Sequence, residues 1–164
     1  MDRVSEHKVL HPLMGRTSVK MTNSIKKRMT LNVCSSLMTQ DLEKNKRSAI
    51  DFYQLAFQGD PKTAVEKYVG NDYKQHNPSV SDGKQGFIDY FERMQKEYES
   101  KSIEFLRVVA ENDLVALHTR QKWPGDEEFV TMDFFRFDEF GKIIEHWDSI
   151  QQVPETSMNQ NSMF

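Results

Sequence analysis

A carboxyl group stands inside an aromatic segment of this sequence, Asp133-Phe134-Phe135-Arg136-Phe137. In a β-strand, Asp133 would point to the face that also carries Phe129, Thr131, Phe135 and Phe137, because alternate side chains share a face. Burial there should raise the pKa of Asp133 unless a cation lies close. Such a carboxyl group is a neutral hydrogen-bond donor or a strengthened base, and either indicates proton transfer. The alternative is a structural carboxylate paired with Arg120 or Lys122.

Histidine supplies a second group that exchanges protons near neutral pH. His118 follows an apolar run and would share a strand face with Leu114, Ala116 and Arg120. An imidazole with an ordinary pKa of about 6.5 can give or take a proton at neutral pH. The alternative is a core histidine whose nitrogens are bonded to the backbone.

His76 and Asn77 stand before Pro78, at the end of a short segment with strand character. Asn77 could donate to a carbonyl or enolate oxygen, with His76 orienting it, near the mouth of a pocket. Equally, Asn-Pro is an ordinary turn former in which the side chain bonds its own backbone.

The segment His146-Trp147-Asp148 places three candidate pocket residues on one strand. Alternation puts His146 and Asp148 on one face and Trp147 on the other, and the sequence leaves open which face is the pocket. Trp147 could be a flat wall against a ligand or a plain core residue. His146 and Asp148 could instead pair within a dimer sheet.

Other chemistries have no motif in this sequence. The five histidines are scattered without metal-ligand spacing, and no glycine-rich phosphate loop or Gly-x-Ser-x-Gly turn is present. The single cysteine, Cys34, provides no disulfide framework and falls outside the patterned part of the chain. We therefore expect cofactor-free proton transfer, with no metal, in a reducing cytoplasmic setting.

Charge and hydropathy exclude two classes of partner. The net charge of −3 and a pI near 6.0 give no global reason to bind nucleic acid. The sequence lacks the ~20 apolar residues of a membrane span and the ~7–15 of a secretory signal. We expect neither a nucleic acid nor a membrane as partner.

Residues 1–40 differ from the rest of the chain. Seven lysines and arginines stand against Asp2 and Glu6, a net charge of +5, and no regular apolar spacing is present. We interpret the segment as disordered. It is a solvated extension, a targeting peptide or sequence translated upstream of the true start, for which Met38 is the favoured initiator because helical patterning begins just after it.

Residues 41–164 are expected to form one α+β domain. Apolar spacings of three and four predict helices from Asp41 to about Gln58, from Pro61, and from Gly83 to about Tyr98, with a short strand over 72–78 between the last two. The period then changes to two over 103–110, 114–123, 128–137 and 142–151. Short connections predict an antiparallel meander, and the long strands favour a strongly curved sheet around the helices, a cone-shaped α+β barrel.

This order of elements, together with three segments and the chain's end, resembles the SnoaL-like polyketide-cyclase branch of the nuclear-transport-factor-2-like superfamily. The resemblance covers about residues 41–164, and residues 1–40 have no counterpart in it. The segments are Tyr73-Lys74-Gln75-His76-Asn77-Pro78, Asp133-Phe134-Phe135-Arg136-Phe137 and Gly141-Lys142-Ile143-Ile144-Glu145-His146-Trp147-Asp148, with the ending Asn159-Gln160-Asn161-Ser162-Met163-Phe164.

The resemblance implies that Asp133 is the general acid/base of an intramolecular aldol condensation. It also implies that His118 is a pocket residue able to hydrogen-bond Asp133 or a substrate carbonyl. The related ketosteroid isomerases use an Asp in a similar context as a protonated oxyanion donor. Asn77 stands about where those isomerases carry their Asp base, which argues against steroid-type isomerisation.

The leading hypothesis is a cofactor-independent lyase or cyclase acting on a small hydrophobic carbonyl compound through Asp133 and His118, with the substrate itself unidentified. It requires the two side chains to lie about 3 Å apart, or one water apart, in one cavity. The alternatives are a non-catalytic ligand-binding or dimerisation module, and a dehydratase or isomerase; the isomerase requires a second carboxylate across the pocket from Asp133. A homodimer is expected, because the outer face of a curled sheet needs cover and the Met163-Phe164 tail could help supply it.

Overall fold

The computed structural model describes residues 42–98, 100–123 and 127–164, which belong to one compact unit. The hypotheses for residues 1–40 and Cys34 lie outside the described residues. No helix in the described part is long and apolar enough to cross a membrane.

Three helices and a short strand occupy the first half of the described chain. The first helix covers residues 42–57 and is followed by α2 (Pro61–Tyr68), β1 (Val69–Gln75) and α3 (Gly83–Glu97). Asp60 caps α2, since its side chain accepts a hydrogen bond of 3.1 Å from the backbone nitrogen of Thr63. Gly59 precedes this cap with a φ of 93°, a left-handed conformation that glycine adopts readily. The three predicted helices are thus confirmed within a residue or two.

The second half forms four long strands: β2 (Ser102–Glu111), β3 (Leu114–Lys122), β4 (Glu128–Phe137) and β5 (Ile143–Gln152). They pair as the predicted antiparallel meander. The sheet order is β1-β5-β4-β3-β2, and β1 joins the edge of the sheet parallel to β5. This parallel pairing brings residues near 75 beside residues near 146.

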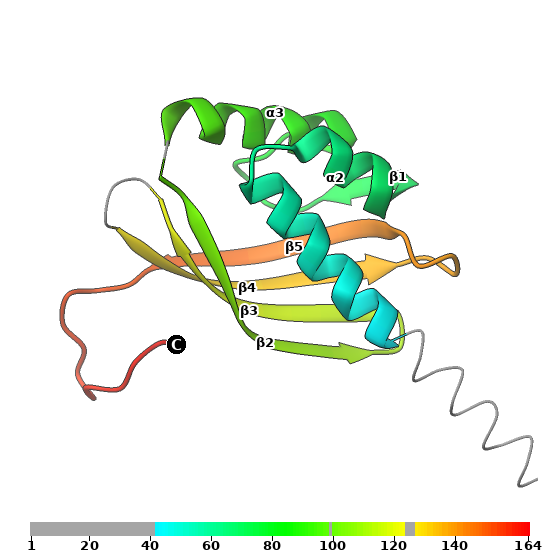
Figure 1. The fold of residues 1–164 in the computed structure, drawn as a ribbon. Helices are drawn as coiled ribbons and strands as arrows, with labels where there is room; N and C mark the ends of the chain where they lie inside the picture. Colours follow the sequence, from blue (N-terminus) through cyan, green and yellow to red (C-terminus); the bar gives the residue numbers. More distant parts are fainter. Residues whose placement is uncertain (1–41, 99, 124–126) are drawn as a thin grey trace, which may run out of the picture. The chain divides into compact units, whose positions relative to one another are not determined.

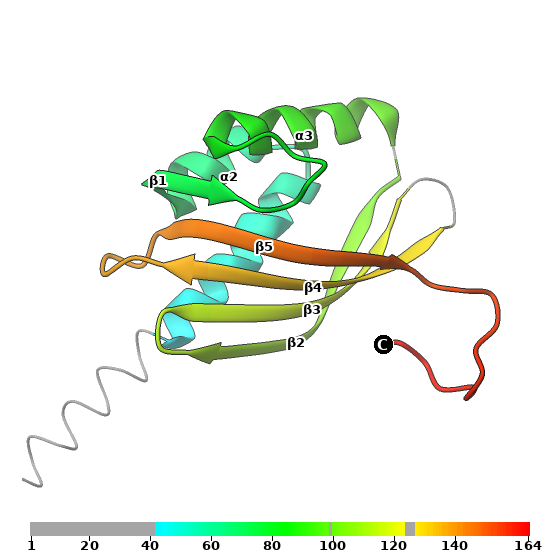
Figure 2. The same ribbon diagram turned by 180° about the vertical axis from the view of Figure 1, so that it is seen from behind.

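The helices cover one face of the sheet and leave the other uncovered (Figures 1 and 2). In both views the start of β2 and the end of β3 curve toward α3, so the sheet bends around the helical layer. The α+β class and the curved sheet are confirmed, and the five strands form an open sheet. We call the covered face the inner face and the other the outer face.

Aromatic rings fill the space between the helices and the inner face. Phe52 of the first helix stacks on Phe87 of α3, with ring centroids 4.6 Å apart. Phe135 of β4 meets Phe52 edge-on at 5.9 Å. All three side chains are fully buried. Inward positions on β4 thus belong to the core, as the alternation predicted.

Replacing Phe135 by alanine should lower the free energy of unfolding by about 3–5 kcal/mol, because it opens a cavity under two packed rings. The matched control is Phe140→Ala, since Phe140 lies exposed in the hairpin between β4 and β5. Urea unfolding followed by circular dichroism measures both. A Phe135→Ala loss no larger than that of the control would contradict the packing described here.

Candidate active site

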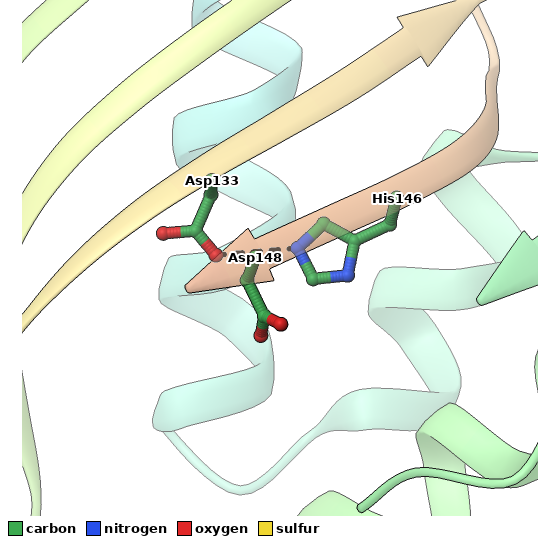
Figure 3. Close-up of side chains that lie close together, drawn as sticks. All are labelled: Asp133, His146 and Asp148. Carbon is green, nitrogen blue, oxygen red and sulfur yellow. Dashed lines mark hydrogen bonds and ion pairs between the residues drawn. The ribbon is translucent and has the colours of Figure 1, made fainter. Parts of the chain in front are cut away.

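Three side chains from three elements meet beneath the first helix. The Tyr53 hydroxyl lies 2.6 Å from Asp133 Oδ1 and 2.8 Å from His146 Nε2, and the two latter atoms are 3.2 Å apart. Asp133 is 1% exposed and His146 is 2% exposed. Figure 3 shows His146 directed toward Asp133 from the neighbouring strand. Asp133 therefore lies on the inner face, as predicted, but its histidine partner comes from β5.

The tautomer of His146 follows from its other nitrogen. Nδ1 lies 3.1 Å from Gln75 Oε1, which also accepts a 2.9 Å hydrogen bond from the backbone nitrogen of Asn77. The Gln75 amide nitrogen in turn donates to the Tyr73 hydroxyl at 3.0 Å. Because these contacts fix the Gln75 oxygen as an acceptor, the His146 Nδ1 must carry a hydrogen.

The triangle of Tyr53, Asp133 and His146 needs more than one hydrogen. Tyrosine brings a single hydroxyl hydrogen, and the shortest contact directs it to Asp133 Oδ1. Without another hydrogen, His146 Nε2 would turn its lone pair toward two oxygen acceptors in a buried site, which is unfavourable. A second hydrogen must therefore lie between His146 Nε2 and Asp133 Oδ1. The cluster stores a proton away from water.

Asp148 supplies a second carboxylate on the same face. It pairs directly across from Asp133 in the register of β4 and β5. Asn77 Nδ2 donates to Asp148 Oδ2 at 2.8 Å, so Asn77 orients a carboxylate. Burial raises the pKa of Asp148, and the nearby His146 and the hydrogen bond from Asn77 only partly oppose the rise. Asp148 is thus a stronger base than an ordinary aspartate, but it lies beside Asp133 on the neighbouring strand, not across the pocket from it as the isomerase alternative requires.

A cavity of about 30 Å³ adjoins this cluster, room for one or two water molecules. Its polar lining comes from Tyr53, Gln75, Asn77, Gln121, His146 and Asp148. Its apolar wall consists of Phe57, Val80, Phe87, Tyr90, Phe91, Met94 and Ile150. Asp133 does not line the cavity and lies behind Tyr53 and His146. A proton from Asp133 would reach a ligand only through one of these two side chains.

The expected contact between His118 and Asp133 is wrong. His118 lies on the outer face, because inward positions on β3 fall on the residues either side of it. Its Nδ1 accepts from Arg107 at 2.8 Å and its Nε2 donates to the backbone oxygen of Met163 at 3.1 Å. Nor does Arg120 or Lys122 pair with Asp133, since both contact Glu128.

His76 and Trp147 also lie away from the cavity. The two rings stack on each other, with centroids 4.8 Å apart, and His76 pairs with Glu145 at 2.9 Å. The expectation that these two residues line the pocket is not met, because the pocket face of β5 is the one that carries His146 and Asp148. Of the predicted pocket residues, Asn77, His146 and Asp148 line the cavity.

Sequence reasoning missed Tyr53 and Gln75. Tyr53 falls within the helix predicted from Asp41 to about Gln58, and its signal is that a buried tyrosine hydroxyl needs a polar partner. Gln75 gave no signal, because its role depends on the parallel pairing of β1 with β5.

Asp133, His146 and Asp148 are the described residues that could together hold a metal ion, since their ligand atoms lie within 4.8 Å of one another. In the present geometry the Tyr53 hydroxyl contacts two of these ligand atoms at 2.6 and 2.8 Å. A first-row metal, with bonds of about 2.0–2.2 Å, would require Tyr53 to move and the three ligands to draw closer. The arrangement as it stands suits protons better than a metal.

A family model described as a SnoaL-like domain matches residues 49–146, which is more than half of the chain. A search of curated proteins found no match.

Solved structures with the same fold include a candidate polyketide cyclase from Bacillus cereus, 18% identical, with a TM-score of 0.58 over 65% of this chain and 74% of the other. A candidate ketosteroid isomerase from Kribbella flavida is 15% identical, with a TM-score of 0.58 over 76% and 92%. An LEH-like epoxide hydrolase from M. tuberculosis is 19% identical, with a TM-score of 0.56 over 67% and 84%. Identities this low show a shared fold.

Replacing Asp148 by asparagine should stabilise the protein at neutral pH. Burial raises the pKa of Asp148 in the folded state above its value in the unfolded chain. The free energy of unfolding therefore falls as the pH rises from the unfolded-state pKa through the folded-state pKa, because the folded protein must then hold an ionised, partly buried carboxylate. We expect Asp148→Asn to raise the Tm at pH 7, and the gain to vanish below about pH 3.8, where both side chains are neutral.

Differential scanning fluorimetry from pH 3 to pH 8 measures this difference. Asp89→Asn is the matched control, since Asp89 is an exposed aspartate on α3 that accepts a hydrogen bond from Gln85. A lower Tm for Asp148→Asn at pH 7 would show that the carboxylate stabilises the fold.

Proposed function

Because the chain belongs to the SnoaL-like domain family, and because its cavity joins a stored proton to a strengthened base, we propose that it is a cofactor-independent enzyme that enolises a small carbonyl compound. The observation that carries the proposal is that Asp148 and Tyr53 line one cavity, while Asp133 and His146 contact the Tyr53 hydroxyl. A base and an acid are thus presented to the same ligand.

The first step is removal of a proton from the carbon next to the substrate carbonyl. Asp148 takes this proton, and the electron pair of the broken C–H bond moves to the carbonyl oxygen. The raised pKa of Asp148 favours the transfer, since a base performs best when its pKa approaches the working pH. Asn77 holds the carboxylate in place through its amide hydrogen.

The second group stabilises the negative charge that develops on oxygen. For this, Tyr53 turns its single hydroxyl hydrogen from Asp133 Oδ1 to the enolate oxygen, as a hydrogen bond or as a transferred proton. Burial and the nearby Asp133 carboxylate raise the pKa of Tyr53 well above its ordinary value, so a free tyrosinate is strongly disfavoured. The Asp133–His146 pair must therefore return a proton to Tyr53 as soon as it gives one up.

The enol can react in two ways, by aldol-type cyclisation or by isomerisation. Attack on a second carbonyl of the same molecule forms a carbon–carbon bond, and the new alkoxide takes a proton from the acid side of the site, which is the aldol-type cyclisation. Return of the proton to a different carbon is an isomerisation, which a single base that takes and returns one proton, here Asp148, would also allow. The 30 Å³ cavity holds only the reacting part of either substrate, so the wall side chains must move to admit more.

Proton abstraction is tested without knowing the natural substrate. Purified protein is incubated in D2O with a panel of 1,3-diketones, cyclic enones and β-keto thioesters, and deuterium uptake at carbon is followed by NMR. We expect uptake above the uncatalysed rate for at least one compound. Asp148→Asn should reduce that rate by about 10²–10⁴-fold, because it removes the base. Tyr53→Phe should reduce it by about 10²–10³-fold, because it removes the oxygen-directed donor.

Asp89→Asn, which alters an exposed carboxylate, should exchange at the wild-type rate. His118→Gln should also keep that rate, because His118 lies on the outer face. Binding of a panel member, seen as a shift in Tm, without any exchange would favour the ligand-binding module over the enzyme.

We also propose that the protein forms a homodimer through the outer face of its sheet. Val109, Met132 and Phe134 are 63%, 48% and 46% exposed there, and Val109 and Phe134 both pair with Ala116 across the strands. The charged neighbours Arg136 and Arg120 are already paired with Asp113 and Glu128 of the same chain. Two copies of this face could therefore meet without like-charge repulsion.

Multi-angle light scattering at micromolar concentration should give the mass of a dimer. Phe134→Glu should give a monomer, because it places a charge in the apolar centre of the face. Met158→Glu is the control, since Met158 is fully exposed on the C-terminal tail. A monomeric wild type would overturn this part of the proposal.

A further inference from the structure

A row of buried polar side chains on the inner face ends at Asp133. Thr119 and Gln121 of β3 lie beside Thr131 of β4, and all three are buried. The Thr119 and Thr131 hydroxyls are 2.7 Å apart, and the Gln121 amide nitrogen lies 3.2 Å from each. The Thr131 hydroxyl in turn contacts Asp133 Oδ2. These contacts form a continuous chain toward the buried carboxylate.

The direction of hydrogen-bond donation along this chain is fixed from its far end. The indole nitrogen of Trp123 can only donate, and it donates to Gln121 Oε1 at 2.9 Å. The Gln121 amide nitrogen therefore faces the two threonines and supplies one hydrogen to each oxygen. Thr119 donates to Thr131, and Thr131 donates to Asp133 Oδ2.

The reverse direction leaves a group unsatisfied. If Asp133 Oδ2 carried a hydrogen, Thr131 would accept it and donate to Thr119, whose own hydrogen would then have no acceptor among the described residues. An unsatisfied buried hydroxyl is unfavourable by about 1–3 kcal/mol. With Tyr53 donating to Oδ1 and Thr131 to Oδ2, both oxygens of Asp133 accept hydrogen bonds. Two such donors favour the ionised carboxylate.

From this chain we propose that His146 holds the stored proton as an imidazolium, with Asp133 as its buried counter-ion and Thr131 as the residue that keeps Asp133 ionised. The inference rests on the proposed function and names the acid within it. His146 lines the cavity and Asp133 does not. When Tyr53 gives its proton to the substrate oxygen, His146 Nε2 gives its own to Tyr53, leaving a neutral imidazole beside an unchanged carboxylate.

The other surroundings of His146 agree with a cation. The ring of Phe135 stacks against the imidazole, with centroids 4.5 Å apart and planes inclined by 16°, and an aromatic face attracts a cation. Gln75 Oε1 accepts from Nδ1, and Asp148 lies on the same strand face. The groups that face His146 are thus Gln75 of β1, Tyr53 of the first helix, Asp133 and Phe135 of β4, and Asp148 of β5, and none of them is a cation.

The test is ¹⁵N NMR of the full-length protein with its histidine rings labelled. Contacts between the ring protons of His146 and the Phe135 ring identify its signals. We expect both ring nitrogens of wild-type His146 to carry hydrogen at pH 7. In Thr131→Val the pH at which Nε2 loses its hydrogen should fall by about one pH unit, because the counter-ion loses a donor.

Thr131→Ser keeps the hydroxyl and should restore the wild-type titration, which a purely structural role for the methyl group would not predict.

If Thr131→Val fails to fold, Gln121→Met is the substitute. It removes the amide that fixes the donation from Thr119 to Thr131, so the pH at which His146 Nε2 loses its hydrogen should again fall. An unprotonated Nε2 in the wild type at pH 7 would overturn the proposal. The measurement needs no substrate, so it can fail while deuterium exchange at carbon still succeeds, and the reverse.

Discussion

The structure depends on how Asp133 is accommodated. Asp133 is almost fully buried, and a buried carboxyl group without hydrogen-bond partners strongly lowers the free energy of unfolding. The fold must therefore supply donors to it. Tyr53 from the helical layer and Thr131 from the same strand donate to its two oxygens, and His146 contacts it from the next strand. The helix, β4 and β5 are thereby locked to one another around a charge.

This requirement also separates two roles that one aspartate could not perform. Asp133 is sealed behind its donors, whereas Asp148, directly across the strand pair, reaches the cavity and is desolvated without a full set of partners. In the proposed function, Asp133 stays ionised and Asp148 takes and returns the substrate proton. Acid and base chemistry on one small ligand needs two groups whose different environments push their pKa values apart.

The helices, the meander and the inward face of β4 could be predicted from the sequence, because each depends on spacing between near neighbours. The aromatic alternation around Asp133 is a local pattern of this kind. The partner of Asp133 could not be predicted in the same way. His118 and His146 both lie on neighbouring strands, and only the register and the facing of each strand decide which of them meets the carboxylate.

By itself, the sequence determined that a carboxyl group would be buried on an aromatic strand of a curved α+β fold, since side-chain alternation and turn chemistry act over a few residues. Only the tertiary structure decided which side chains hydrogen-bond to that carboxyl group. Tyr53 is 80 positions away and Gln75 is joined to His146 by the parallel pairing of β1 with β5. Hydrogen bonds between such distant residues exist only after the sheet has closed over the helices, because no local rule sets their distance.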